Sequence, residues 1–124
     1  MAKKDKDDID FEIQFYESIL KERPCFVEAL MALGDLYTKK GLHAEGLRID
    51  ERLYQLKADD PLVLYNLTCS YSLLNKIDSA FRTLKEALEN GYDDINYLVA
   101  DPDLENLRKD YRFPKLLSEV KQQK

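Results

Sequence analysis

The chain has 124 residues, of which 44% are hydrophobic and 35% charged, and its 19 basic and 24 acidic side chains give a net charge of −5. This length suits one domain with a real core, and the composition is ordinary for a soluble, helix-rich protein. An acidic chain without clustered Lys and Arg offers no duplex-binding surface, so we expect no nucleic-acid partner. No apolar run approaches a membrane span, and the first eight residues lack the apolar core of a secretion signal. We therefore expect no membrane partner and a cytoplasmic location.

The N-terminal region predicts a flexible tail over residues 1–7, followed by a helix that ends before Pro24. A proline disfavours helical angles in the residue before it, which sets that end. The apolar residues of this helix recur at steps of three and four, as one buried stripe requires. The stripe consists of Ile9, Ile13, Tyr16 and Leu20, widened by Phe15 and Ile19.

Two further helices are predicted over residues 26–40 and 43–57. Gly34 lies inside the first of them, where glycine costs about 1 kcal/mol relative to alanine. We expect another backbone to approach closely at that point. Gly41 supplies the left-handed residue that ends the helix.

The stretch from Leu30 to Tyr37 has an echo at Leu64 to Tyr71, 34 residues downstream. A fixed period of that length is typical of a chain built from copies of one helical hairpin. In the second copy Asp59 or Asp60 caps the helix, and Pro61 takes its first position. That copy stops at Asn75, and its partner helix over 78–90 closes at Gly91.

The pattern changes after Tyr92. Asp93 and Asp94 can cap a short helix, the chain restarts at residues 101–103, and a last helix spans 114–122. We interpret this region as an atypical closing unit, because one face of a terminal unit must meet water.

These residues resemble the tetratricopeptide repeat family, whose pattern places leucine, glycine and tyrosine on the first helix of each repeat. The resemblance implies an all-α, right-handed superhelical stack of antiparallel helix hairpins. Its boundaries would be a single domain over 8–124, with a half-repeat at 8–24, repeats at 27–60 and 61–92, and a cap at 93–122. The residues around 101–113 resemble the endings of bacterial family members, which indicates a small bacterial-type protein. The matching positions are Leu30, Leu33, Gly34, Tyr37 and Gly46, then Leu64, Leu67, Tyr71, Ala80, Leu84 and Ala87.

Asp50 departs from the family pattern, which calls for an aromatic residue there. One interpretation is that its helix is rolled slightly, so that Ile49 and Leu53 lead instead. The other is that Asp50 lies at a solvated rim, and the rarity of fully buried aspartate favours this second interpretation.

The resemblance also implies a concave surface formed by the first helix of each repeat, in which a peptide or partner surface binds. We expect Tyr65 to anchor the partner, because tyrosine is common among interface hot spots. In a competing interpretation the C-terminal segment packs over this surface and turns it into core. The candidate binding residues are Met31, Asp35, Leu62, Tyr65, Asn66, Cys69 and Ser72.

The family's clamp for chaperone C-termini is excluded by the residues that stand in its place. Met31 and Asp35 replace a lysine and an asparagine of that clamp, and Asn66 alone matches. A carboxylate ligand would meet an acid and no fixed cation, which is repulsive.

Nothing in the sequence supports catalysis or a cofactor. His43 lacks a placed nucleophile, there is no Gly-rich phosphate loop, and no Cys or His spacing suits a metal. The acidic pairs at 7–8, 59–60 and 93–94 precede helices, where carboxylates cap free N–H groups. Cys25 and Cys69 lie too far apart in the hairpin arrangement to form a disulfide.

The sequence therefore predicts a non-catalytic scaffold or adaptor that binds a protein or peptide, with no cofactor and no metal. The alternative is a self-associating structural module, a weak homo-oligomer that stacks through its N-terminal helix. Arg108 and Arg112 could lock the closing segment through ion pairs or, in a functional interpretation, form an anion site; exposed pairs are individually weak.

Overall fold

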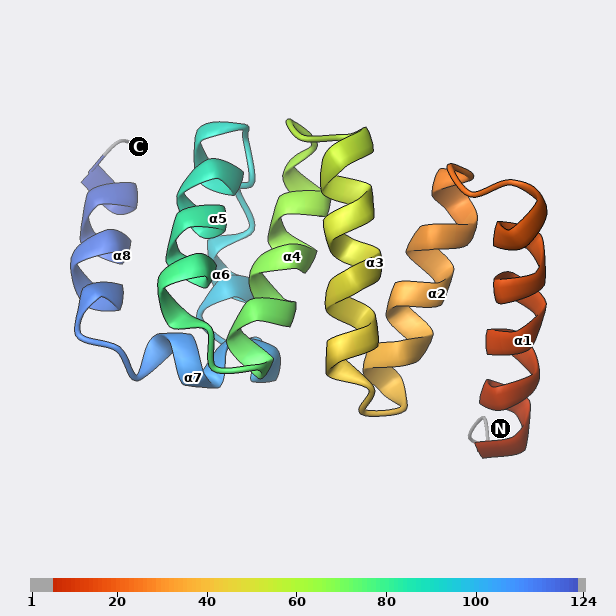
Figure 1. The fold of residues 1–124 in the computed structure, drawn as a ribbon. Helices are drawn as coiled ribbons and strands as arrows, with labels where there is room; N and C mark the ends of the chain where they lie inside the picture. Colours follow the sequence, from red (N-terminus) through yellow and green to blue (C-terminus); the bar gives the residue numbers. More distant parts are fainter. Residues whose placement is uncertain (1–5, 123–124) are drawn as a thin grey trace. The chain divides into compact units, whose positions relative to one another are not determined.

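The computed structural model describes residues 6–122, and every regular element in that range is a helix (Figure 1). The expected all-α class is therefore confirmed. None of the described helices is both long and apolar enough to cross a membrane. The elements are α1 (Lys6–Glu22), α2 (Val27–Lys39), α3 (His43–Leu56), α4 (Pro61–Leu73), α5 (Ile77–Glu89), α6 (Ile95–Leu98), the 3-10 helix η1 (Pro102–Leu104), α7 (Glu105–Arg108) and α8 (Arg112–Gln122).

The chain divides into two compact units between Ala58 and Asp59, here called the N-terminal and the C-terminal unit. The division between these units lies close to the predicted repeat boundary at 60/61. Residues 1–5 of the expected tail lie outside the described range. Residues 6 and 7 belong to α1, so the acidic pair at 7–8 lies within the first turn of the helix rather than before it.

The N-terminal unit consists of α1, α2 and α3, with α2 packed against both neighbours (Figure 1). Its core forms because α2 presents leucines at helical spacing, and Leu30, Leu33 and Leu36 are at most 3% exposed. From α1, Ile13 and Leu20 are buried as predicted, but Phe15 is 53% exposed and does not widen the buried stripe.

The crossing of α2 and α3 is close at Gly34. A Cβ built there would lie 3.3 Å from Asp50 Oδ1 and 3.4 Å from Ile49 Cγ2. Close approach at Gly34 was predicted, although the approaching atoms belong to side chains rather than to backbone. Gly46 on α3 is less confined, since a Cβ built there would make ordinary contacts, 3.5 Å from Thr38 Oγ1 and 3.8 Å from Tyr37 Cβ.

Asp50 is buried, with 7% of its surface exposed. The expectation of a solvated rim position is therefore wrong. The missing side chain of Gly34 leaves space at the helix crossing, and the small Asp50 side chain lies there beside it. Ile49 and Leu53 are buried in the same helix, at 7% and 2% exposure.

The C-terminal unit begins with the α4–α5 hairpin, which repeats the α2–α3 hairpin. The bounds of α4 are those of α2 displaced by 34 residues, and α5 begins 34 residues after α3. Leu64 and Leu67 are buried like their counterparts Leu30 and Leu33. The period seen in the sequence is thus a repeat of helix bounds and of buried positions.

Three helices end in the same left-handed turn, as predicted. Gly41 has φ +83°, Gly91 has φ +106°, and Asn75 has φ +59°. In each turn the next residue donates a hydrogen bond back across the helix end: Leu42 to Tyr37, Lys76 to Tyr71, and Tyr92 to Ala87, at 2.8 to 2.9 Å. This shared turn makes each following helix or segment reverse direction.

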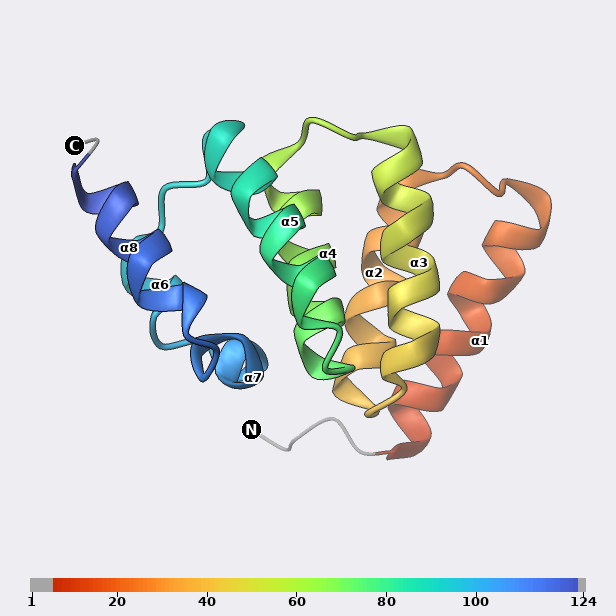
Figure 2. The same ribbon diagram turned by 60° about the vertical axis from the view of Figure 1, so that its left-hand side comes forward.

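The closing segment starts at Tyr92 and includes α6, η1, α7 and α8 (Figure 2). In it, η1 and α7 pack against α4, and α7 also packs against α5. Aspartates cap α4 and α6, as predicted for the pairs at 59–60 and 93–94: Asp60 accepts from Leu62 N at 2.9 Å, and Asp94 accepts from Tyr97 N at 3.1 Å. Asp101 caps η1 in the same way.

We expect Gly41→Ala to lower the free energy of unfolding by about 1–2 kcal/mol, because an L-residue strains the left-handed region. A Cβ at Gly41 meets nothing within 4 Å, so the loss of stability comes from backbone strain and not from a steric clash. Urea denaturation followed by circular dichroism measures it. Gly41→Asn is the matched control and should lose less, as Asn75 holds the equivalent turn. Equal stability of wild type and Gly41→Ala contradicts the prediction.

Candidate functional site

The candidate site lies on the face of α4 that the sequence predicts as a groove. α4 is a well-capped helix with Pro61 at its start, and its residues at steps of three and four share one face. Tyr65, Cys69 and Ser72 lie on this face at 4%, 8% and 0% exposure. The closing segment of the same chain covers them.

Asp101 is the centre of that cover. It is only 3% exposed, and its Oδ2 accepts a hydrogen bond from the Tyr65 hydroxyl at 2.6 Å. Its Oδ1 accepts from the backbone N–H of Asp103 at 3.0 Å, which starts η1. Both carboxylate oxygens are therefore used, one to cap a helix and one to hold the segment on α4.

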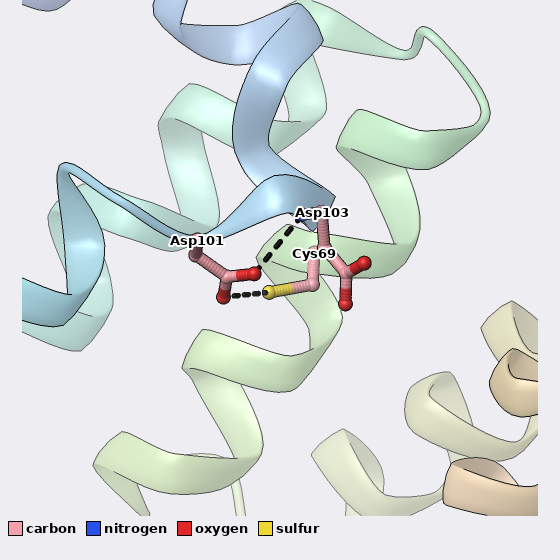
Figure 3. A group of neighbouring side chains, drawn as sticks. All are labelled: Cys69, Asp101 and Asp103. Atoms are coloured by element: carbon pink, nitrogen blue, oxygen red, sulfur yellow. Dashed lines mark hydrogen bonds between the residues drawn. The ribbon is translucent and has the colours of Figure 1, made fainter.

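Cys69 brings a thiol to the same carboxylate, as Figure 3 shows, with Sγ 3.7 Å from Asp101 Oδ2. Together with Asp103, the ligand atoms of the three side chains lie within 4.8 Å of one another. A metal would require the thiolate form of Cys69. Burial, and then the negative charges of Asp101 and Asp103, raise the pKa of the thiol well above its ordinary range. Since Asp101 is already occupied by three donors, the arrangement fits a hydrogen-bond network better than a metal site.

Arg108 also stabilises the closing segment, through hydrogen bonds to its backbone. Its guanidinium donates to two backbone carbonyls, Asp101 O at 2.6 Å and Leu98 O at 3.3 Å. It therefore locks the segment through the backbone rather than through the expected ion pairs. Arg112 does form ion pairs, with Asp78 at 2.8 Å and Asp110 at 2.9 Å, and it lies over the ring of Phe81.

The far end of the α4 face is covered by α7. Ser72 accepts from the backbone N–H of Leu107 at 3.3 Å, and Asn106 donates to the carbonyl of Ser72 at 3.0 Å. Leu104 and Leu107 are fully buried in the core that contains Tyr65 and Cys69. Removing this cover would expose several large apolar side chains, so it belongs to the folded core.

The expectation of an open groove at Tyr65, Cys69 and Ser72 is therefore corrected: the chain's own closing segment occupies that face, as the competing interpretation held. The physical reason is that the last hairpin has an apolar face with no following repeat to cover it. Leu62 and Asn66 remain accessible, Leu62 at 49% exposure and Asn66 half-buried. In the N-terminal unit Met31 is half-buried, and Asp35 is exposed and pairs with Lys39 at 3.0 Å.

Aromatic rings form the edge of the covered face. Tyr92 stacks on Tyr65 with ring centroids 4.3 Å apart, and Tyr97 lies at 6.2 Å in a tilted contact. Tyr97 is 52% exposed, and Leu62 lies one helical turn before Tyr65. The side chains of Leu62 and Tyr97 are thus accessible near the buried Tyr65.

Sequence reasoning missed the roles of Asp101, Tyr92 and Tyr97. The spacing of Asp101 before Pro102 does indicate a helix cap. No local pattern indicates that its other oxygen reaches Tyr65, 36 residues away, because an irregular segment makes that connection.

Two other polar residues lie apart from this network. His43 is the first residue of α3, as expected, and its Nδ1 is buried without a hydrogen-bond partner among the described residues. Cys25, in the turn before α2, is an exposed free thiol, and Cys69 is a buried one.

Comparison with known proteins gives an informative match to a plant protein. The chain is 34% identical over 102 residues to a curated protein of Arabidopsis thaliana that is described as chloroplastic. The aligned part is 80% of this chain but only 30% of the plant protein. The chain therefore spans about three tenths of the length of the curated relative that it matches. No protein-family model matches the sequence.

We expect Tyr65→Phe to lower the free energy of unfolding by about 1.5–3 kcal/mol, the usual contribution of a hydrogen bond to a charged group. The phenyl ring keeps the packing on Tyr92, so the change isolates the hydroxyl that Asp101 Oδ2 accepts. Chemical denaturation measures the change. Tyr111→Phe is the matched control, because Tyr111 is 85% exposed, and it should leave stability unchanged. A Tyr65→Phe variant as stable as this control contradicts the assigned role.

We also expect stability to fall as the pH rises above about 9, the ordinary pKa of a cysteine thiol. Burial raises the pKa of Cys69, and burial and the bond to Asp101 raise the pKa of Tyr65, so the folded state retains protons that the unfolded chain loses. Each group lowers the unfolding free energy by up to about 1.4 kcal/mol per pH unit above its unfolded pKa. Urea titrations between pH 8 and 11 test this. In Cys69→Ala the onset should move towards pH 10, the ordinary pKa of tyrosine; an unchanged onset contradicts the assignment to Cys69.

Proposed function

We propose that the protein is a non-catalytic scaffold of the tetratricopeptide-repeat kind, which binds a partner protein or peptide. The observation that carries the proposal is the pair of hairpins whose corresponding helices begin 34 residues apart, since that period characterises the family. A right-handed superhelical stack of such hairpins is the arrangement we propose for the whole chain. The match to part of a plant protein is compatible with this proposal and says nothing of a partner.

The proposed binding surface consists of Leu62 and Asn66 of α4 and Tyr97 of α6, here called the α4 rim. Leu62 and Tyr97 are both about half exposed, so each has apolar surface that a partner could bury. Asn66 can orient a bound backbone through its amide, which both donates and accepts. Tyr65 is buried next to Tyr97 and would help to hold this surface in place rather than contact the partner itself.

The composition of the rim suits an extended peptide or a loop with one or two apolar side chains. The net charge of −5 argues against nucleic acid as the partner. Free thiols at Cys25 and Cys69 suit a reducing compartment, and we propose the cytoplasm.

Site-specific crosslinking tests the proposal. A photoreactive amino acid is placed at position 62 or 97 in otherwise wild-type protein and at position 111 as an exposed control, and each variant is irradiated in lysate of the source organism. We expect positions 62 and 97 to capture the same partner and position 111 to capture none of it.

Purified partner then gives the energetics. Leu62→Ser combined with Tyr97→Ser should weaken binding about tenfold or more, as loss of a buried anchor does. Tyr111→Ser should leave it unchanged. Two results rule out the rim as the site. One is capture of unrelated proteins at the two rim positions, and the other is a double variant that binds the partner as tightly as wild type does.

A further inference from the structure

The outer face of α1 carries a regular line of exposed residues. Asp8, Phe11, Phe15, Ser18 and Glu22 follow one another at steps of three, four, three and four. That spacing places all five on one narrow stripe of a helix, the spacing of a helix-pairing seam. All five are exposed, and Phe11 and Phe15 are 70% and 53% exposed. We call this line the α1 stripe.

The opposite face of α1 holds the helix in place. Ile13 and Leu20 are buried at 7% and 8% exposure, and α1 packs on α2. At its edges the Tyr37 hydroxyl donates to Glu17, and Lys40 pairs with Asp10. Because these contacts fix the inner face, the α1 stripe is presented outward on an anchored helix. The two phenylalanines lie one turn apart, and Phe15 also meets the ring of Tyr16 edge-on at 5.1 Å.

The charges on the stripe select among possible occupants. Asp8 lies one turn before Phe11, and Glu22 lies two turns after Phe15, so both ends of the apolar pair are acidic. In a parallel pair of copies Asp8 meets Asp8 and Glu22 meets Glu22, and in an antiparallel pair Asp8 meets Glu22. Either arrangement sets like charges against each other around the apolar centre, which disfavours the pairing. A second copy is therefore a poor occupant of this face.

A basic helix satisfies the same geometry. Its lysine or arginine side chains would meet the acids at both ends, and its apolar residues would cover the two phenyl rings. We propose that the α1 stripe docks an amphipathic helix of a partner protein, with two apolar residues one turn apart and basic residues beyond them at both ends. This surface lies on α1 alone, so it stands or falls independently of the α4 rim.

Fluorescence anisotropy with synthetic peptides tests the proposal directly. The probe is a labelled helical peptide of Ala and Gln that carries two Leu one turn apart, with Lys one turn before and two turns after them. Two matched peptides accompany it: one with Glu in place of Lys, and one with the same composition in scrambled order. We expect the basic amphipathic peptide to bind at least about tenfold more tightly than either, and its affinity to fall with added salt.

The variants separate the apolar and the charged parts of the stripe. Phe11→Ser with Phe15→Ser should weaken binding about tenfold or more, since burial of one phenylalanine contributes more than a decade of affinity. Tyr111→Ser is the control for loss of an exposed aromatic ring and should bind as wild type. Asp8→Lys with Glu22→Lys keeps both phenyl rings and should reverse the preference, towards the peptide with Glu.

Three results would overturn the proposal. The first is equal binding of the ordered and the scrambled basic peptide, which would reduce the effect to general charge. The second is unchanged binding by both the serine double variant and the charge-reversed variant, with helicity verified by circular dichroism. The third is a dimer of the chain in light scattering that the two serine substitutions dissociate, because a second copy would then cover the stripe.

Discussion

The hydrogen bond from the Tyr65 hydroxyl to Asp101 is the interaction on which the C-terminal unit depends. It joins the repeated hairpin to the closing segment, and the same carboxylate starts η1 through Asp103. Because Asp101 is buried, its charge is tolerated only with donors on both oxygens. Arg108 then secures the backbone of this segment at Asp101 and Leu98. Together these bonds position Leu104 and Leu107 over α4 and complete its core.

The two hairpins share their buried leucines and their turns but solve the helix crossing differently. In the N-terminal unit Gly34 on α2 leaves space that the side chains of Asp50 and Ile49 on α3 occupy. In the C-terminal unit Thr68 takes the place of Gly34, and its hydroxyl meets that of Thr83 at 2.7 Å. Leu84 replaces Asp50 there and is fully buried. The same helix crossing thus holds a single buried aspartate beside a glycine in one hairpin and a hydrogen-bonded pair of threonines in the other.

The accessible surface has a different character in each unit. The closing segment reduces the α4 face to a small rim around Leu62 and Tyr97, where apolar exposure is local. The α1 stripe is longer, regular and acidic at both ends, because every residue that packs on α2 lies on the other side of that helix. The rim suits a peptide with few anchors, whereas the stripe suits a whole helix. Both follow from which side chains the folded core leaves out.

The sequence by itself determined the helices, their ends and the repeat. Periodic leucines, aspartate caps and left-handed stops at Gly41, Asn75 and Gly91 act within a few residues, so a local pattern is enough to predict them. Only the tertiary structure decided what covers each face. Asp50 became buried because Gly34 leaves room beside it, and Phe15 stayed exposed because α1 has a neighbour on one side within its unit. Tyr65 was predicted to be a binding anchor but is part of the core. An irregular segment places Asp101, 36 residues later in the chain, within hydrogen-bond distance of its hydroxyl. Burial and hydrogen bonding between distant residues depend on how the chain returns upon itself, and no short-range spacing encodes that path.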